Sequence, residues 1–169
     1  MTVVFLAMFS SSFFKYKYLL ELLSVKLILQ RVTSASVYVD TEKIANIDKG
    51  ILVFFGAEKG DGKNQVCFLV EKTLNLRIFP GDSGKMNFSC VDVGGDILVV
   101  PQFTLVGDCS RGRRPRFDRA ADPDTARTLY EYYVELLIRS GLKVSMGRFA
   151  KDMKVQSVND GPVTFLLDR

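Results

Sequence analysis

From Lys26 onward, the hydrophobic and polar positions of the chain follow a regular pattern. Residues 27–32 and 34–39 are rich in β-forming residues, and residues 51–57 (ILVFFGA) are a continuous apolar run that is typical of a buried strand. Residues 96–105 (DILVVPQFTL) predict a further strand. Because Pro101 cannot donate a ladder hydrogen bond, we expect it at an edge, an end or a bulge of that strand.

Two segments have helical periodicity instead. Apolar residues of the first segment, 64–76, recur at the spacing of one amphipathic helix face. The second helix is expected to begin after Asp122, a good N-cap residue, with Pro123 at its first position, and to end at Ser140 and Gly141. Its predicted core face consists of Ala126, Leu129, Tyr130, Tyr133, Val134 and Leu137.

The end of the chain predicts two strands, residues 154–158 and 163–167, separated by the turn residues Asn159, Asp160, Gly161 and Pro162. The whole pattern is that of one mixed α/β domain with more strand than helix. We find no internal repeat, low-complexity tract or linker in the sequence.

Composition narrows the chemistry. The 169 residues are 47% hydrophobic and 25% charged, as in an ordinary globular protein, with a net charge of +4. That charge fits a polyanionic partner without demanding one. The three cysteines show no C-x-x-C spacing, so neither a disulfide framework nor a zinc site is indicated. The chain has no histidine, which excludes Ser-His-Asp and Cys-His mechanisms.

Residues 1–24 differ from the rest of the sequence. They contain a short apolar run, four serines and two lysines, and the run is too short to span a bilayer. We expect an N-terminal extension that is not part of the native fold, with residues 25–169 as the domain. Two origins stay open: translated upstream DNA, with Val25 as the natural first residue, or a targeting or anchoring segment.

Two short motifs carry the functional information: Pro-Gln-Phe-Thr-Leu at 101–105 and Asn-Asp-Gly-Pro-Val-Thr at 159–164. Strand and turn chemistry would explain either motif alone. Together and in this order they resemble the D-aminoacyl-tRNA deacylase family, whose signatures are S-Q-F-T-L and N-x-G-P-x-T. The resemblance extends to residues 30–32, 84–87 and 147–149 and to the last strand, and so covers residues 25–169.

The resemblance implies a fold, an assembly and a reaction. The fold would be a compact, β-rich α/β (α+β) domain with mostly antiparallel, barrel-like sheets and two main helices. The protein would be a cytoplasmic homodimer, without cofactor, metal or membrane, that acts on D-aminoacyl-tRNA. It would hydrolyse the ester to free tRNA and amino acid, as a chiral proofreading step in translation, and would accept mischarged glycyl-tRNA too.

The family's functional positions can be carried over residue by residue. Gly161 and Pro162, joined by a cis bond, would reach into the partner subunit's pocket, where their backbone carbonyls exclude an L side chain. Arg31 would brace these carbonyls, and Asn159 and Thr164 complete this substrate-binding and chiral filter. The predicted catalytic segment is Gln102, Phe103 and Thr104, which line the pocket; backbone N–H groups near Phe103 and Thr104 would hold the oxyanion.

The missing histidine is consistent with this mechanism, because the family is thought to use the 2′-hydroxyl of the terminal adenosine to assist attack on the neighbouring ester. Thr104 has no activating base near it in sequence, so we assign it a binding role. Residues 111–119 hold five arginines. We expect Arg111, Arg113, Arg114 and Arg116 to contact tRNA phosphates in a sequence-independent manner, although a solvated loop is the alternative.

One position departs from the family pattern. Pro101 stands where the family usually has serine. A related animal group carries P-Q-A-T-L, a trans Gly-Pro bond and altered chirality, but Phe103, Asn159 and Arg31 agree with the D-specific family. We therefore expect the cis form, with such a trans relative as one alternative. A noncatalytic tRNA-binding or RNA-binding module is the other.

Overall fold

The computed structural model describes residues 25–169, so the expectation for residues 1–24 lies outside the described part of the chain. The central element is the long strand β1 (Lys26–Val39), in which buried and partly buried side chains alternate over most of its length. β1 forms antiparallel pairs with three strands: β8 along its length, β3 beside its first half and β2 beside its second half. The bounds are β2 Glu42–Ile47, β3 Gly50–Gly56, β6 Asp96–Pro101, β7 Val144–Met146 and β8 Lys154–Asp168.

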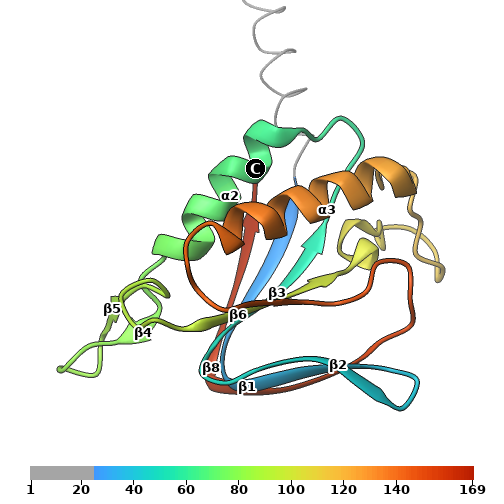
Figure 1. Ribbon diagram of the computed structural model, residues 1–169. Coiled ribbons are helices and arrows are strands. Elements are labelled where there is room, and N and C mark those ends of the chain that lie inside the picture. The colour runs from blue at the N-terminus through green and yellow to red at the C-terminus, as the bar shows by residue number, and fades with distance from the viewer. Residues whose placement is uncertain (1–24) are drawn as a thin grey trace, which may run out of the picture.

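Because β1 changes partner halfway, the sheet curls into a barrel-like form (Figure 1). The strand order is β2-β1-β3-β6-β7, with β8 added on β1. The two ends of this order approach each other, since the Ser145 hydroxyl of β7 donates a 3.3 Å hydrogen bond to the Asn46 carbonyl of β2. The curled sheet encloses a small apolar cluster composed of Val32, Ala35, Val37, Ala45, Ile47, Leu52, Leu98 and Val100.

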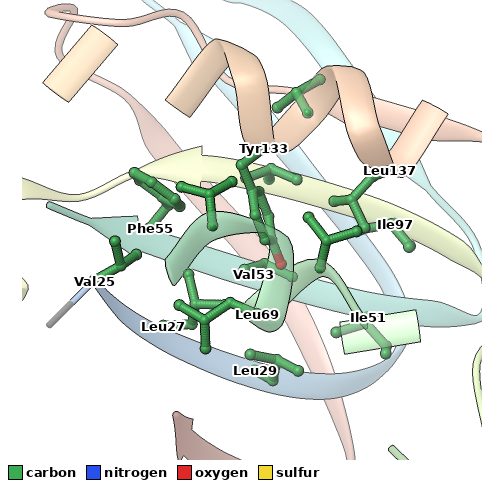
Figure 2. Packing of buried hydrophobic residues seen from close by; sticks show 14 of the residues in the cluster. Val25, Leu27, Leu29, Ile51, Val53, Phe55, Leu69, Ile97, Tyr133 and Leu137 are labelled. Atoms are coloured by element: carbon green, nitrogen blue, oxygen red, sulfur yellow. The ribbon is translucent and has the colours of Figure 1, made fainter. Parts of the chain in front are cut away.

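The other face of the sheet carries the main core. Helices α2 (Lys63–Asn75) and α3 (Pro123–Ile138) cover this face, as Figure 1 shows. Figure 2 shows Leu69 of α2 and Tyr133 of α3 among side chains of β1 and β3. Burying each such large side chain stabilises the fold by about 1.5–3 kcal/mol. The Tyr133 hydroxyl also bonds Thr73 of α2 at 2.6 Å, which joins the two helices.

Several sequence predictions are confirmed by these elements. Strand β3 and both helices lie where the pattern placed them. The Asp122 side chain accepts a 3.0 Å hydrogen bond from the Thr125 N–H, so Asp122 caps α3 as expected. Of the predicted α3 core face, only Ala126 is not fully buried. The barrel-like, mostly antiparallel fold with two main helices is confirmed as well.

Two predicted elements were wrong in extent. The strand predicted for residues 96–105 ends at Pro101, which pairs with Phe55, and a 3₁₀ helix, Phe103–Val106, follows. Pro101 thus lies at a strand end, one of the three places expected for it. Residues 154–158 and 163–167 are not two strands of a hairpin but parts of the single strand β8, since both pair antiparallel with β1.

A small hairpin completes the described chain. Strands β4 (Phe79–Pro80) and β5 (Met86–Phe88) pair with each other outside the main sheet. Figure 1 shows them projecting beyond the lower end of α2. The hairpin begins directly after Ile78, whose carbonyl is used by the site described next.

Candidate functional site

The motif at 159–164 forms a bulge in β8. Between Gln30 and Val32, β1 advances by two residues while β8 runs from Thr164 back to Asn159. The surplus residues of β8 therefore leave the sheet. Gly161 and Pro162, joined by a cis bond as predicted, are exposed on this bulge. Gly161 has a φ of +140°, a conformation that residues with a side chain rarely adopt.

Asn159 and Thr164 close the neck of the bulge. The side-chain oxygen Oδ1 of Asn159 accepts a 2.7 Å hydrogen bond from the Val163 N–H, and its side-chain Nδ2 donates a 2.9 Å bond to the Thr164 hydroxyl. Gln30 of β1 also donates to Thr164, at 3.4 Å. These contacts place Asn159 and Thr164 at the base of the bulge, where they shape the Gly-Pro turn.

Arg31 holds the bulge from inside the protein. Its side chain is 10% exposed, and its Nε donates a 3.0 Å hydrogen bond to the Asp160 carbonyl and lies 3.1 Å from the Asp160 carboxylate. Its Nη1 donates a 2.6 Å bond to the Ile78 carbonyl. The carbonyl that Arg31 binds is thus that of Asp160, one residue before Gly161. Sequence reasoning missed Asp160 and Ile78 as partners of this brace.

The motif at 101–105 lies at the end of β6. The Gln102 N–H donates a 2.7 Å hydrogen bond to the Phe55 carbonyl, and the Gln102 side-chain amide bonds the Thr104 hydroxyl. The first N–H bonded within the 3₁₀ turn is that of Leu105, to the Gln102 carbonyl. Within residues 25–169, the N–H groups of Phe103 and Thr104 donate to no protein acceptor. Two neighbouring backbone donors are therefore available to a ligand.

One chain does not bring the two motifs together. Strands β1 and β3 lie between β8 and β6, and three strand spacings amount to about 14 Å along the sheet. The motifs are also offset along β1: Pro101 is level with Leu27, whereas the bulge is level with Arg31. Four strand residues add about 13 Å. Within one chain, the two motifs are therefore separated both across the sheet and along β1.

The arginine-rich loop follows the first motif and is closed by a clasp. Asp108 and Arg116 exchange two backbone hydrogen bonds, of 2.8 and 3.0 Å, and their side chains form a 2.5 Å ion pair. Hydrogen bonds from Ser110 and Arg116 hold the pKa of Asp108 well below its usual range. Arg111, Arg113 and Arg114 are exposed between the clasp residues, whereas Arg116 is engaged by Asp108. Sequence reasoning missed Asp108.

A buried acidic pair anchors the other end of this loop. Glu58, 1% exposed, forms ion pairs with Arg119 at 2.6 Å and with Lys26 of β1 at 2.9 Å. Its backbone N–H donates a 2.6 Å hydrogen bond to Asp61, whose second carboxylate oxygen is buried without a hydrogen-bond partner in the described chain. Burial raises the pKa of Asp61 to about 6. The loop that carries the arginines is thereby attached to the core.

A cleft of about 370 Å³ adjoins the first motif. Gly147, one of its lining residues, lies against Pro101: a Cβ at Gly147 would be 3.1 Å from the proline Cδ. The Tyr130 hydroxyl lies 3.0 Å from the Val99 carbonyl oxygen and 3.1 Å from the Gly147 carbonyl oxygen. These hydrogen bonds hold Tyr130 and Gly147, two of the lining residues, in place. The cleft is lined by Ile44, Arg127, Tyr130, Glu131, Met146, Gly147, Arg148 and Phe149.

Other site chemistries find little support in residues 25–169. That part of the chain has no group of three or more His, Cys, Asp or Glu side chains that could hold a metal ion. Burial raises the pKa of the Cys90 thiol to about 12, while Cys67 and Cys109 are exposed and free. Among the same residues, no helix is both long and apolar enough to cross a membrane.

Comparison with known proteins agrees with the two motifs. Residues 28–168 match the family model described as D-Tyr-tRNA(Tyr) deacylase. A D-aminoacyl-tRNA deacylase from Pelobacter propionicus is 51% identical over 145 residues, which are 86% of this chain and 100% of that protein. Another, from Syntrophotalea carbinolica, is 53% identical over 144 residues, 85% of this chain and 97% of that one.

Solved structures show the same fold. The structure of a c-Myc DNA unwinding element binding protein superposes with a TM-score of 0.79 at 39% identity, covering 84% of this chain and 97% of that chain. A probable eukaryotic D-amino acid tRNA deacylase superposes with a TM-score of 0.75 at 19% identity, over 86% and 100% of the two chains. At that lower identity, the second likeness supports the fold alone.

Proposed function

Because the chain belongs to the D-Tyr-tRNA(Tyr) deacylase family and is therefore a hydrolase, we propose that it hydrolyses the ester of D-aminoacyl-tRNA and selects against L-amino acids by exclusion. The observation that carries this proposal is the exposed Gly161-Pro162 bulge, fixed at its base by Arg31 and Asn159. The backbone atoms of the bulge are exposed to a ligand and are held in a fixed position. Backbone beside the substrate's α-carbon leaves room for hydrogen but not for an L side chain.

The same exclusion predicts which substrates are accepted. A D side chain points away from the bulge, and glycine has no side chain to exclude. The filter reads chirality at the α-carbon and not the identity of the side chain. Glycyl-tRNA is therefore a substrate on this proposal, and different D-amino acids are hydrolysed at similar rates.

The separation of the two motifs supports a homodimer with a composite pocket. Within one chain, β1 and β3 lie between the Gly-Pro bulge and the 101–105 segment. In a twofold dimer, the bulge of one subunit enters the pocket of its partner. Each pocket then contains the 101–105 segment of one subunit and the Gly-Pro bulge of the other. Both pockets are then equivalent.

The hydrolytic step requires little from the side chains. Water adds to the ester carbonyl carbon, the N–H groups of Phe103 and Thr104 hold the resulting oxyanion, and the bond to the 3′-oxygen breaks as that oxygen takes a proton. These two N–H groups have no acceptor within residues 25–169. The chain has no histidine, and the neighbouring 2′-hydroxyl of the terminal adenosine assists the attack. Positioning of an already activated ester supplies the rest of the rate enhancement.

The arginine loop supplies the contact with the body of the tRNA. Arg111, Arg113 and Arg114 are exposed at the loop tip and are available to phosphates. Arg116 serves the clasp with Asp108 instead, so its expected phosphate contact is the weakest of the four. A protein that recognises tRNA in this way performs chiral proofreading in the cytoplasm, where charged tRNA is used.

Release of amino acid from charged tRNA tests the proposal. Purified protein is incubated with D-tyrosyl-tRNA, L-tyrosyl-tRNA and glycyl-tRNA, and the remaining ester is followed with time. We expect rapid release of D-tyrosine and glycine and no release of L-tyrosine above the uncatalysed rate. Equal release of both tyrosine enantiomers would refute the exclusion filter. Binding of tRNA without any release would instead identify a noncatalytic RNA-binding module.

A further inference from the structure

Two exposed phenylalanines face each other, one from the motif at 101–105 and one from the arginine-rich loop that follows it. Phe103 of the 3₁₀ helix is 62% exposed and Phe117 of the arginine loop is 37% exposed, and their ring centroids lie 5.0 Å apart at an interplanar angle of 57°. Such rings usually find a place in a core, and this sequence leaves both at the surface. Only Phe103 belongs to the motifs discussed above.

The position of Phe117 is fixed by its neighbours. Gly107 lies so close that a Cβ on it would be 2.9 Å from the Phe117 Cε1, so the absence of a side chain at Gly107 is what admits the ring. Phe117 also directly follows Arg116, which the clasp ties to Asp108. The ring is therefore held in place while much of its surface stays open to solvent.

The surroundings of the pair are cationic. Arg111, Arg113 and Arg114 are exposed on the same loop, between the clasp residues and a few positions before Phe117. Exposed aromatic rings beside arginines are the combination that binds single-stranded nucleic acid, because bases stack on the rings while the cations contact the phosphates. A stack on an aromatic ring tolerates any base sequence.

We propose that Phe103 and Phe117 form a stacking platform for an unpaired base of the substrate's single-stranded 3′ end. On the proposed function Phe103 lines the pocket at the reacting nucleotide, so Phe117 takes the base next to that nucleotide. The inference rests on the proposed function, since it names how the same site binds its RNA. Phe117 is a binding residue on this account and takes no part in ester hydrolysis.

A fluorescence titration tests the platform directly. The protein has no tryptophan, so Phe117→Trp introduces its only indole. The probes are two RNA hairpins without an attached amino acid. One ends in a single-stranded ACCA tail at its 3′ end, and the other is the same hairpin with a blunt end. We expect the tailed hairpin to quench the indole and the blunt hairpin to leave it nearly unchanged. Equal signals from the two hairpins would overturn the proposal.

A matched control uses the other phenylalanine of equal exposure. Phe88 of β5 is also 37% exposed but lies on the β4–β5 hairpin. A Phe88→Trp protein should respond to neither RNA. If its emission were quenched by the tailed hairpin as strongly as that of Phe117→Trp, the effect would not be stacking at the platform.

Kinetics separate stacking from packing. Phe117→Leu keeps an apolar side chain but removes the π-face, and Phe117→Tyr keeps the face. One stacked base corresponds to about a 5- to 150-fold change in affinity, so KM for D-tyrosyl-tRNA should rise by that factor in Phe117→Leu, with kcat nearly unchanged and with Phe117→Tyr close to the parent. An unchanged KM in a folded Phe117→Leu protein would refute the platform. If the parent itself releases no D-tyrosine, the proposed function fails while the quenching experiment still decides whether RNA stacks here.

Discussion

At the scale of single residues, the proposed chemistry depends on positions where the backbone conformation and the neighbouring atoms admit only one residue type. Gly161 is the clearest example. A Cβ at this position would lie 2.6 Å from Val163 Cγ2, 3.0 Å from the Val163 N atom and 3.2 Å from Arg31 Nη2. The bulge itself therefore requires a glycine at this position, and on the proposed function the space for the ligand requires it too.

We therefore expect Gly161→Ala to abolish most D-tyrosyl-tRNA hydrolysis and also to lower the free energy of unfolding by about 1–3 kcal/mol, because it strains the brace as well as the pocket. Gly141→Ala is the matched control: Gly141 also has a positive φ, of +81°, but nothing lies within 4 Å of its added Cβ. The control should lose some stability and keep its activity. Full activity in Gly161→Ala would show that the bulge does not border the substrate.

The cysteines provide a second test at this scale. Burial keeps the Cys90 thiol protonated by raising its pKa to about 12, and an unionised thiol is a poor nucleophile. Cys67 and Cys109 are exposed, away from any histidine, since the chain has none. A Cys67→Ser, Cys90→Ala, Cys109→Ser protein should release D-tyrosine within about twofold of the parental rate. A folded triple variant without turnover would point to covalent catalysis by a thiol.

At the scale of elements, local sequence signals predicted most segments, and the sheet decided the rest. The helices and β3 follow from periodicity and from the Asp122 cap. Turn residues at 159–162 suggested a hairpin, but pairing with β1 on both sides makes one strand and turns the same residues into a bulge. Strands β2 and β7 are short and have no strong pattern, so only their neighbours reveal them.

The site shows the same division. The two motifs predicted Gly161, Pro162 and the 102–104 segment as site residues, and the family resemblance at residues 30–32 added Arg31; these assignments stay predictions. The partners that hold them could not be found in this way, because they lie far away in sequence. Arg31 reaches the Ile78 carbonyl across 47 positions, and Glu58 meets Arg119 across 61. Contacts over such separations follow from topology, which a single sequence does not display.

The Glu58-Asp61 pair predicts a pH dependence of stability. Burial raises the pKa of Asp61 from its ordinary value of 3.8 to about 6, with the Glu58 charge adding to the shift and the Glu58 N–H and Lys26 opposing it. The folded protein therefore binds this proton more tightly than the unfolded chain. The stabilisation is fully present below about pH 4 and is lost as the pH rises through about 6.

Asp61→Asn removes this titration while keeping an acceptor for the Glu58 N–H. Relative to the parent, the free energy of unfolding of the variant should rise by roughly 1–3 kcal/mol between pH 4 and pH 7. Urea unfolding at several pH values measures the difference. Parallel profiles for the two proteins would show that Asp61 is not held in a protonation-sensitive environment.

At the scale of the whole molecule, the arginine loop should control how salt affects tRNA binding. Replacing Arg111, Arg113 and Arg114 by serine removes three exposed charges at the tip and leaves the clasp intact. Each lost phosphate contact lowers the slope of log affinity against log salt by about 0.9, so the slope should fall by about 2–3. A control with Lys49, Lys63 and Lys72 replaced by glutamine loses the same charge elsewhere. An equal change in both proteins would show that only net charge matters.

At the scale of the whole molecule, the curled sheet also places the two motifs on strands that β1 and β3 separate. We propose that each pocket combines the 102–104 segment of one subunit with the Gly-Pro bulge of its partner. Phe103→Ala removes the ring from the first part but keeps its backbone N–H groups, so the assay is run well below KM, where weaker substrate binding lowers the rate. Gly161→Ala impairs the second part. Neither homodimer then has an intact pocket, whereas a mixed dimer of the two variants has one intact pocket and one doubly impaired pocket.

Mixing the two variants during refolding or co-expression is the most direct test. Equal amounts should give about a quarter of the parental D-tyrosyl-tRNA hydrolysis, since half of the dimers are mixed and half of their pockets are intact. Parent mixed equally with the Phe103→Ala, Gly161→Ala double variant should also give about a quarter. A pocket built within one chain predicts otherwise: no recovery from the two single variants and about half of the parental activity with the double variant, which would contradict the account.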